Sequence, residues 1–194
     1  MNHQDRIAID IHTHAEVSCW NRFDAYGEEH DRAADTYFRS SNRPTIAETI
    51  TRYREKKIGC IMFTVDAKSN LGRKRKRKRK ANDEIAFAAN ENSDMMMAFA
   101  SIDPHKGKMG AREAERLVKE HSVKGCKFHP KVPMHLDDVA VNFGDMQIVM
   151  AHLCFPWQNE ALSVATHKPN VWIDLSGWSP NNSENSSCIT PTRS

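Results

Sequence analysis

The chain lacks the features typical of membrane-spanning and secreted proteins. Its longest apolar runs, residues 58–65 and 95–100, are far shorter than the roughly 18–20 residues that a membrane-spanning helix needs. The first residues, MNHQDR, contain no apolar stretch of signal-peptide length. We therefore expect a cytoplasmic protein with no transmembrane segment.

Two further absences exclude other classes of site. The five cysteines are scattered and form no C-x-x-C pair, so we expect reduced thiols that mostly fill space in the interior. No G-x-G-x-x-G turn follows the first apolar run, which argues against a dinucleotide-binding fold.

Basic charge is concentrated in one run, residues 73–80 (RKRKRKRK). Outside that run 20 basic residues face 25 acidic ones, a balance of −5. One reading of the run is a nuclear-import or nucleic-acid-binding patch, which would give the chain a polyanionic partner. The other, which we favour, is a solvated basic loop, because nucleic-acid-binding domains spread basic residues over a face and interleave them with aromatics.

Short apolar runs alternate with amphipathic stretches six times, and this alternation predicts βα units. The expected strands are residues 7–11, 58–65, 95–102, 125–128, 146–151 and 171–175. The expected helices are residues 45–57, 83–90, 111–121, 135–143 and 158–167. Thr45 and Glu48 fit a capping box at the start of the first of these helices.

The expected strands are continuously apolar, which predicts a parallel sheet covered on both faces and hence an α/β fold. Polar residues follow several of these runs directly, as His12, Asp66, Asp103, His129 and His152 do. Catalytic residues of a TIM barrel cluster at the C-terminal ends of its strands, so the pattern favours a (β/α)₈ barrel over an open sheet. Six units are fewer than eight, so we expect an incomplete barrel domain over residues 1–180 and a polar tail over residues 181–194.

His12 and His14 form the clearest candidate site. Residues two apart in a strand point to the same face, so both imidazoles could bind one metal ion at the strand end. The alternative is a pair of solvated loop histidines.

Five motifs, in this order, resemble the amidohydrolase-related family, in the branch that includes aminocarboxymuconate-semialdehyde decarboxylase and resorcylate decarboxylase. They are Asp10-Ile-His-Thr-His14, Phe99-Ala-Ser-Ile-Asp-Pro104, Gly125-Cys-Lys-Phe-His-Pro130, Ile148-Val-Met-Ala-His152 and Asn170-Val-Trp-Ile-Asp-Leu-Ser176. The resemblance implies a metal-dependent hydrolase-type barrel that hydrolyses or decarboxylates a small carboxylated or aromatic substrate.

The resemblance also implies roles for individual residues. His12 and His14 would bind a divalent metal, Zn²⁺ in the first instance. His152 would be the catalytic histidine that polarises water or carries a proton. The alternative is a structural histidine, buried and hydrogen-bonded to a backbone carbonyl. His129 would lie near the substrate pocket or support it. We expect Asp103 and His105 to shape a loop, and Asp174 to have a structural role.

The chain also departs from the family pattern. A strand that carries a further metal-binding histidine is missing after Pro130, and so is the late Gly-Ser-Asp segment with its metal-binding aspartate. His135 is a weak candidate replacement, because it lies at a helix start. A second hypothesis is therefore a relative without catalytic activity that acts as a binding or oligomerising fragment. Substrate identity and homo-oligomer formation are left open.

Overall fold

The computed structural model describes residues 5–15, 17–20, 43–64, 77–128, 136–152 and 157–176, and for residues 77–80 it describes the backbone alone. The chain divides into two compact units, Met1–Val132 and Pro133–Ser194, and each is described here by itself. Both units are α/β, as the alternating sequence pattern predicts.

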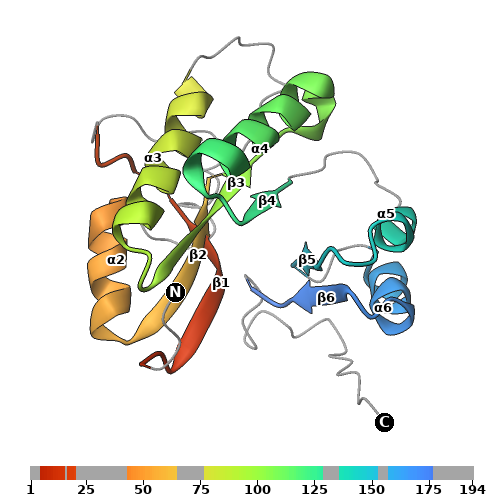
Figure 1. Cartoon of the computed structure of the whole chain (residues 1–194). Helices are drawn as coiled ribbons and strands as arrows, with labels where there is room; N and C mark the ends of the chain where they lie inside the picture. Colours follow the sequence, from red (N-terminus) through yellow and green to blue (C-terminus); the bar gives the residue numbers. More distant parts are fainter. Residues whose placement is uncertain are drawn as a thin grey trace. The chain divides into compact units, whose positions relative to one another are not determined.

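The first unit contains a four-stranded parallel sheet in the order β1-β2-β3-β4. Three helices, α2, α3 and α4, connect consecutive strands and pack beside the sheet (Figure 1). The elements are β1 (Ala8–His14), α2 (Ile46–Glu55), β2 (Ile58–Phe63), α3 (Arg77–Glu91), β3 (Met96–Ser101), α4 (Lys108–His121) and β4 (Gly125–Lys127).

The core of this unit lies between the sheet and the helices. Met62 of β2, Ile85 of α3 and Leu117 of α4 have no exposed surface. Burying an aliphatic side chain of this size contributes roughly 1.5–3 kcal/mol. The helices therefore pack on one face of the sheet, which leaves the opposite side chains of the strands for the candidate site.

Helix α2 begins as the sequence predicts. The Thr45 hydroxyl accepts a hydrogen bond from the Glu48 amide at 3.2 Å, and the Glu48 carboxylate accepts one from the Thr45 amide at 2.8 Å. This reciprocal capping box satisfies two amides that the first helical turn leaves without partners.

Helix α3 corrects the expectation of a basic loop over residues 73–80. The helix begins at Arg77, six residues before the predicted start at residue 83, so the second half of the basic run is helical. Arginine and lysine are good helix formers, and this helix propensity outweighs the solvated loop that the charge of the run predicts. Residues 73–76 lie outside the described residues.

The second unit contains two parallel strands, β5 (Ile148–Ala151) and β6 (Val171–Asp174), and the helices α5 (Leu136–Asn142) and α6 (Gln158–His167). Ala140, Met150, Ala161 and Val171 form its buried core. The buried Asn170 amide also donates to the carbonyls of Ala140 and Met146, at 3.2 and 3.0 Å, which ties the end of α5 to the start of β6.

All six predicted strands are present, and the boundaries differ by up to three residues. The largest shift at a strand end concerns β1, which extends to His14 rather than ending at residue 11, so the histidine pair lies within the strand. In the described ranges the parallel pairs are β1–β2, β2–β3 and β3–β4 in the first unit and β5–β6 in the second. The expected tail at residues 181–194 lies outside the described residues. None of the described helices is long and apolar enough to cross a membrane.

Candidate active site

The side chains of His12 and His14 converge at the C-terminal end of β1. Their Nε2 atoms are 3.1 Å apart, and the ring centroids are separated by 5.0 Å. Both side chains are half-buried. The two-residue period of a strand places both imidazoles on the same face, as the sequence predicts.

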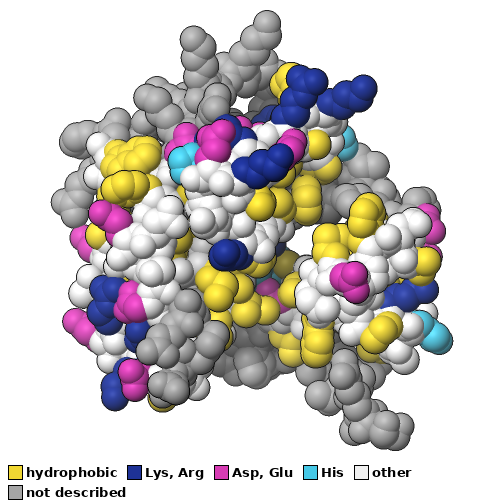
Figure 2. Space-filling view, in the orientation of Figure 1, with side chains coloured by type: hydrophobic (Ala, Val, Ile, Leu, Met, Phe, Trp, Pro, Cys, Tyr) yellow, Lys and Arg dark blue, Asp and Glu magenta, His cyan; other side chains and the backbone are white. Residues whose placement is uncertain are grey.

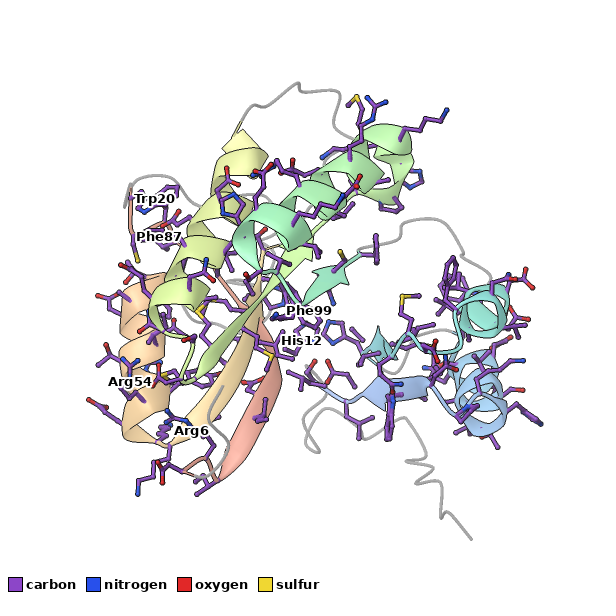
Figure 3. All side chains as sticks on the ribbon, viewed as in Figure 1. Arg6, His12, Trp20, Arg54, Phe87 and Phe99 are labelled. Atoms are coloured by element: carbon purple, nitrogen blue, oxygen red, sulfur yellow. The ribbon has the colours of Figure 1, made fainter. Side chains whose placement is uncertain are left out.

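Strands β2 and β4 contribute further side chains to this end of the sheet. The ring of Phe63, at the end of β2, presents an edge-type contact to each imidazole, with centroid distances of 5.1 Å in both cases. The Lys127 ammonium, at the end of β4, lies 5.1 Å from the centroid of the Phe63 ring. The sheet thus brings two imidazoles, an aromatic wall and a cation together, from β1, β2 and β4 (His12 is labelled in Figure 3).

Asp10 lies two residues before His12, a spacing that in a regular strand would place it on the same face as His12. Its carboxylate is instead bound by the hydroxyl of Tyr53 from helix α2. Its Oδ2 accepts a hydrogen bond from the Tyr53 hydroxyl at 2.5 Å, and its Oδ1 accepts one from the His12 amide at 2.9 Å. The pairing of β1 with β2 shifts register between Asp10 and Thr13. This irregularity breaks the simple alternation of faces, so Tyr53 also contacts Thr13, at 3.4 Å.

Burial, followed by the hydrogen bond to Asp10, raises the pKa of Tyr53 to about 12. The phenol therefore stays protonated at neutral pH and acts as a donor to the Asp10 carboxylate. That bond holds the strand segment that precedes His12.

A buried polar network supports the ends of β2 and β3. The Asn82 side chain of α3 accepts from the Ser101 amide at 3.0 Å and donates to the Ser101 carbonyl at 3.1 Å. The Ser101 hydroxyl donates to the carbonyl of Thr64. One side-chain amide thus satisfies both backbone groups of Ser101.

The segment after β1 is held by a buried carboxylate. Glu84 of α3 is 3% exposed and accepts hydrogen bonds from the Ser18 hydroxyl at 2.7 Å and the Cys19 amide at 2.6 Å. It also accepts one from the Trp20 amide at 3.2 Å. The chain that leaves the histidine pair is therefore anchored to α3.

The histidine pair has the spacing that one metal ion requires. Two nitrogen ligands of a tetrahedral zinc ion, each at 2.0–2.1 Å from it, lie about 3.3 Å apart. The observed 3.1 Å is close to that value. Within the ranges that the structure describes, however, no three His, Cys, Asp or Glu side chains form a metal-binding group. The pair thus fits two positions of a site that needs a third protein ligand.

His152 lies in the second unit, directly after β5. Its Nδ1 is 2.7 Å from the carbonyl oxygen of Ser176, and its side chain is exposed. Asp174, at the end of β6, accepts hydrogen bonds from the amide and the hydroxyl of Ser176, at 2.8 and 2.9 Å. Asp174 thus organises a turn, in agreement with a structural role.

The remaining candidates divide between described and undescribed residues. The Asp103 carboxylate is 2% exposed and accepts from the His105 amide at 3.0 Å, which caps a short 3₁₀ turn and fits the expected loop-shaping role. His129, Asp66 and His135 lie outside the described residues, so the predictions that concern them stay predictions.

Four residues with clear places in these sites were not singled out from the sequence: Tyr53, Phe63, Lys127 and Ser176. Phe63, Lys127 and Ser176 lie at or just after strand ends, which is the signal that could have identified them. No such signal exists for Tyr53, because its partner lies 43 residues away in the chain.

Comparison with known families and solved structures yields one sequence match and several structural ones. Residues 129–191 match a family model described as Amidohydrolase. That segment contains His129, His152 and Asp174. No curated protein sequence matches the chain.

Among solved structures, an uncharacterised TIM-barrel protein from Bordetella bronchiseptica is similar, with 15% sequence identity and a TM-score of 0.58. The match covers 87% of this chain and 75% of that one. This likeness shows the fold: the βα units are those of a TIM barrel, of which the chain forms a part.

Two further structures align more loosely. A 2,6-dihydroxybenzoate decarboxylase from Rhizobium has 14% identity and a TM-score of 0.47, over 85% of this chain and 64% of that one. A structure described as an amidohydrolase from Staphylococcus aureus has 11% identity and a TM-score of 0.42, over 95% of this chain and 53% of that one. The chain thus spans less than two thirds of each of these two proteins.

Proposed function

We propose that this chain is a member of an amidohydrolase-related family and a metal-dependent enzyme that hydrolyses or decarboxylates a small carboxylated or aromatic substrate. The observation that carries the proposal is the 3.1 Å separation of the His12 and His14 Nε2 atoms at the C-terminal end of a parallel strand. That end of the strands is where TIM-barrel enzymes place their chemistry.

His12 and His14 would hold the metal, with Zn²⁺ as the first candidate because imidazole nitrogen suits it. When bound, such an ion supplies Lewis-acid polarisation of a substrate oxygen or of water. The protein contributes orientation. The Asp10 carboxylate accepts hydrogen bonds from the His12 amide and from the Tyr53 hydroxyl. Helix α2, which carries Tyr53, therefore holds the backbone that carries the histidine pair.

The neighbours of the pair support a carboxylated or aromatic substrate. Lys127 supplies a positive charge beside the ring of Phe63, and a lysine ammonium is a natural partner for a carboxylate. Phe63 offers a flat apolar wall against which a small aromatic ring can pack.

His152 would carry the proton. Histidine is the side chain that most readily exchanges a proton near neutral pH. Its place directly after β5 follows the barrel rule for catalytic residues. His129, which lies in the segment matched by the amidohydrolase model, would contribute to the substrate pocket.

Metal analysis of the purified full chain tests this proposal. Elemental analysis after dialysis against zinc should find close to one ion per chain in the wild type and almost none in a His12→Ala/His14→Ala variant. A His105→Ala/His167→Ala variant removes two other histidines and should keep the wild-type metal content. Negligible metal in the wild type would overturn the proposal.

A second candidate function is a non-catalytic relative that binds or oligomerises. It is favoured by the two-ligand histidine pair and by apolar side chains on the surface of the second unit, where Val149 and Trp172 are paired across β5 and β6 and are 48% and 46% exposed. Figure 2 shows hydrophobic side chains on the surface of this unit. Sedimentation and thermal melting separate the two: a monomer with a single cooperative melt argues against this candidate, and broad melting with association supports it.

A further inference from the structure

The ends of β5 and β6 form a small hydrogen-bonded arrangement around one imidazole. The His152 Nδ1 is 2.7 Å from the Ser176 carbonyl oxygen and 3.3 Å from the Ser176 hydroxyl. The Asp174 carboxylate binds Ser176 through both of its oxygens, at 2.8 Å to the amide and 2.9 Å to the hydroxyl. The carbonyl that meets the imidazole is therefore held by Asp174.

The backbone of His152 is fixed by the same strand pair. Its amide donates to the Asp174 carbonyl at 3.0 Å, one step beyond the pairing of Ala151 with Asp174. Its φ angle is +63°, in the left-handed region that non-glycine residues adopt rarely. Asp174 thus contacts both partners of the imidazole–carbonyl hydrogen bond: its backbone carbonyl binds the His152 amide, and its side chain binds Ser176.

This geometry selects one form of the neutral imidazole. A carbonyl oxygen can only accept a hydrogen bond, so a nitrogen 2.7 Å from it has to carry the proton. With the proton on Nδ1, the lone pair of the neutral ring lies on Nε2. The hydrogen bond made by one ring nitrogen commonly decides the role of the other.

We propose that Asp174 is a positioning residue: it holds the Ser176 turn so that the Ser176 carbonyl fixes His152 as the Nδ1–H tautomer, with Nε2 as the nitrogen that exchanges the proton. The inference rests on the proposed function only for the catalytic use of His152. When Nε2 takes up a proton, the bond from Nδ1–H to the Ser176 carbonyl is kept.

The tautomer can be read directly by two-bond ¹H–¹⁵N correlation spectra of the full chain labelled with ¹⁵N-histidine, at a pH where the imidazoles are neutral. A His152→Gln variant assigns the signals by their disappearance. The expected wild-type pattern has a protonated Nδ1 and an unprotonated Nε2. A protonated Nε2 in the wild type would overturn the inference.

Asp174→Ala is expected to replace the single tautomer of His152 by a mixture, because both bonds to Ser176 are lost. Asp145→Ala, at an exposed aspartate of the same unit, serves as the matched control and should leave the spectrum unchanged. If Asp174→Ala does not fold, as judged by circular dichroism, Asp174→Asn is used instead, since its NH₂ group replaces one of the two accepting oxygens and cannot accept a hydrogen bond. An unchanged tautomer in a folded Asp174 variant would refute the positioning role.

These spectra need neither metal nor substrate, so they separate this inference from the proposed function. The expected tautomer in a chain that binds no zinc would support the positioning role while overturning the proposed function. Zinc bound through His12 and His14, together with the wrong tautomer, would do the reverse.

Discussion

The Tyr53 hydroxyl donates a hydrogen bond to the Asp10 carboxylate at 2.5 Å, and so joins helix α2 to strand β1 two residues before His12. Tyr53 comes from the helix side of the sheet, whereas His12 and His14 contact Phe63. Because the strand register shifts between Asp10 and Thr13, the Asp10 side chain can contact helix α2 while the His12 side chain contacts Phe63. The support of the candidate metal ligands is therefore part of the packing of α2.

Tyr53→Phe should destabilise the protein by about 1–3 kcal/mol, because it leaves a partly buried carboxylate without a strong donor. Urea unfolding of the full chain measures the loss. The double variant Tyr53→Phe/Asp10→Asn should lose less stability than the sum of the losses of the two single variants. Strict additivity would mean that the two side chains do not interact.

The same bond predicts an effect at alkaline pH. The pKa of Tyr53 in the folded protein is about 12, above its ordinary value of 10.0, so the folded state holds this proton more tightly than the unfolded state. The stabilisation is present below pH 10 and is lost as the pH rises through 12. Unfolding free energies measured across this window should fall more steeply for the wild type than for Tyr53→Phe. Parallel curves would contradict the prediction.

Cys60 should be inert towards thiol reagents in the folded protein. It has no exposed surface, and burial raises its pKa to about 12, which suppresses the reactive thiolate. Cys19 is exposed and is the internal reference. Brief labelling with iodoacetamide, followed by peptide mass spectrometry, should modify Cys19 well before Cys60, and urea should abolish the difference. Equal native rates would show that β2 opens readily.

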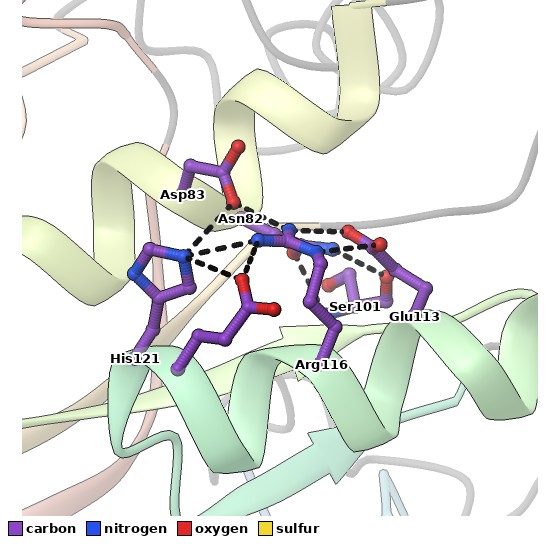
Figure 4. A network of polar contacts seen from close by, with 7 residues as sticks. Asn82, Asp83, Ser101, Glu113, Arg116 and His121 are labelled. Carbon is purple, nitrogen blue, oxygen red and sulfur yellow. Dashed lines mark hydrogen bonds and ion pairs between the residues drawn. The ribbon is translucent and has the colours of Figure 1, made fainter.

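Arg116 braces α3 and α4. Its guanidinium contacts Asp83 at 2.5 Å, Glu113 at 2.8 Å and the His121 imidazole at 3.0 Å (Figure 4). Its side chain is 14% exposed. Arg116→Met should cost about 1–3 kcal/mol, because it leaves two half-buried carboxylates without their shared cation.

The matched control for this brace is Lys119→Met on the same helix. Lys119 pairs with Glu115 at 2.6 Å, but the two side chains are 71% and 59% exposed, so solvent screens the pair. Chemical denaturation should show no measurable loss for this variant. A loss as large as that of Arg116→Met would mean that α4 is sensitive to charge rather than to the brace.

Position 125 needs glycine because the ring of Phe99, its partner across β3 and β4, occupies the space that a side chain would take (Phe99 is labelled in Figure 3). A Cβ at this position would lie 2.5–2.7 Å from three ring atoms. Gly125→Ala should cost about 1–3 kcal/mol in thermal or urea unfolding, and Phe99→Leu should recover part of that loss. Gly144→Ala is the control, since nothing lies within 4 Å of its added Cβ.

The left-handed backbone of His152 predicts an unusual order of stability. At φ +63° a Cβ costs about 1–2 kcal/mol, so His152→Gly should be more stable than His152→Ala. His105 does not have a positive φ, so at this position alanine should be more stable than glycine. Urea unfolding of the four variants measures this, and alanine more stable than glycine at both positions would contradict the backbone argument.

Local patterns in the chain predict much of this fold. The alternation of apolar and amphipathic stretches predicts six βα units, and all six strands are found. The capping box at Thr45 and Glu48 is confirmed atom by atom. The predicted start of α3 at residue 83 is wrong: residues 77–80 are helical, because arginine and lysine favour helices even in a highly charged run.

The candidate site was predictable only in part. The histidine pair follows from the two-residue strand period, which is a property of nearby residues alone. The placement of Phe63 and Lys127 depends on the alignment of β1, β2 and β4, and their pairing joins residues far apart in the chain. The register shift that turns Asp10 towards Tyr53 has no local signature.

The sequence by itself therefore determined the type and order of the elements and the convergence of His12 and His14, because backbone periodicity acts over a few residues. The tertiary structure decided which groups surround that pair and which nitrogen of His152 meets the Ser176 carbonyl. Those relationships are hydrogen bonds and ring contacts between separate strands and helices. Their geometry depends on register and packing across the sheet.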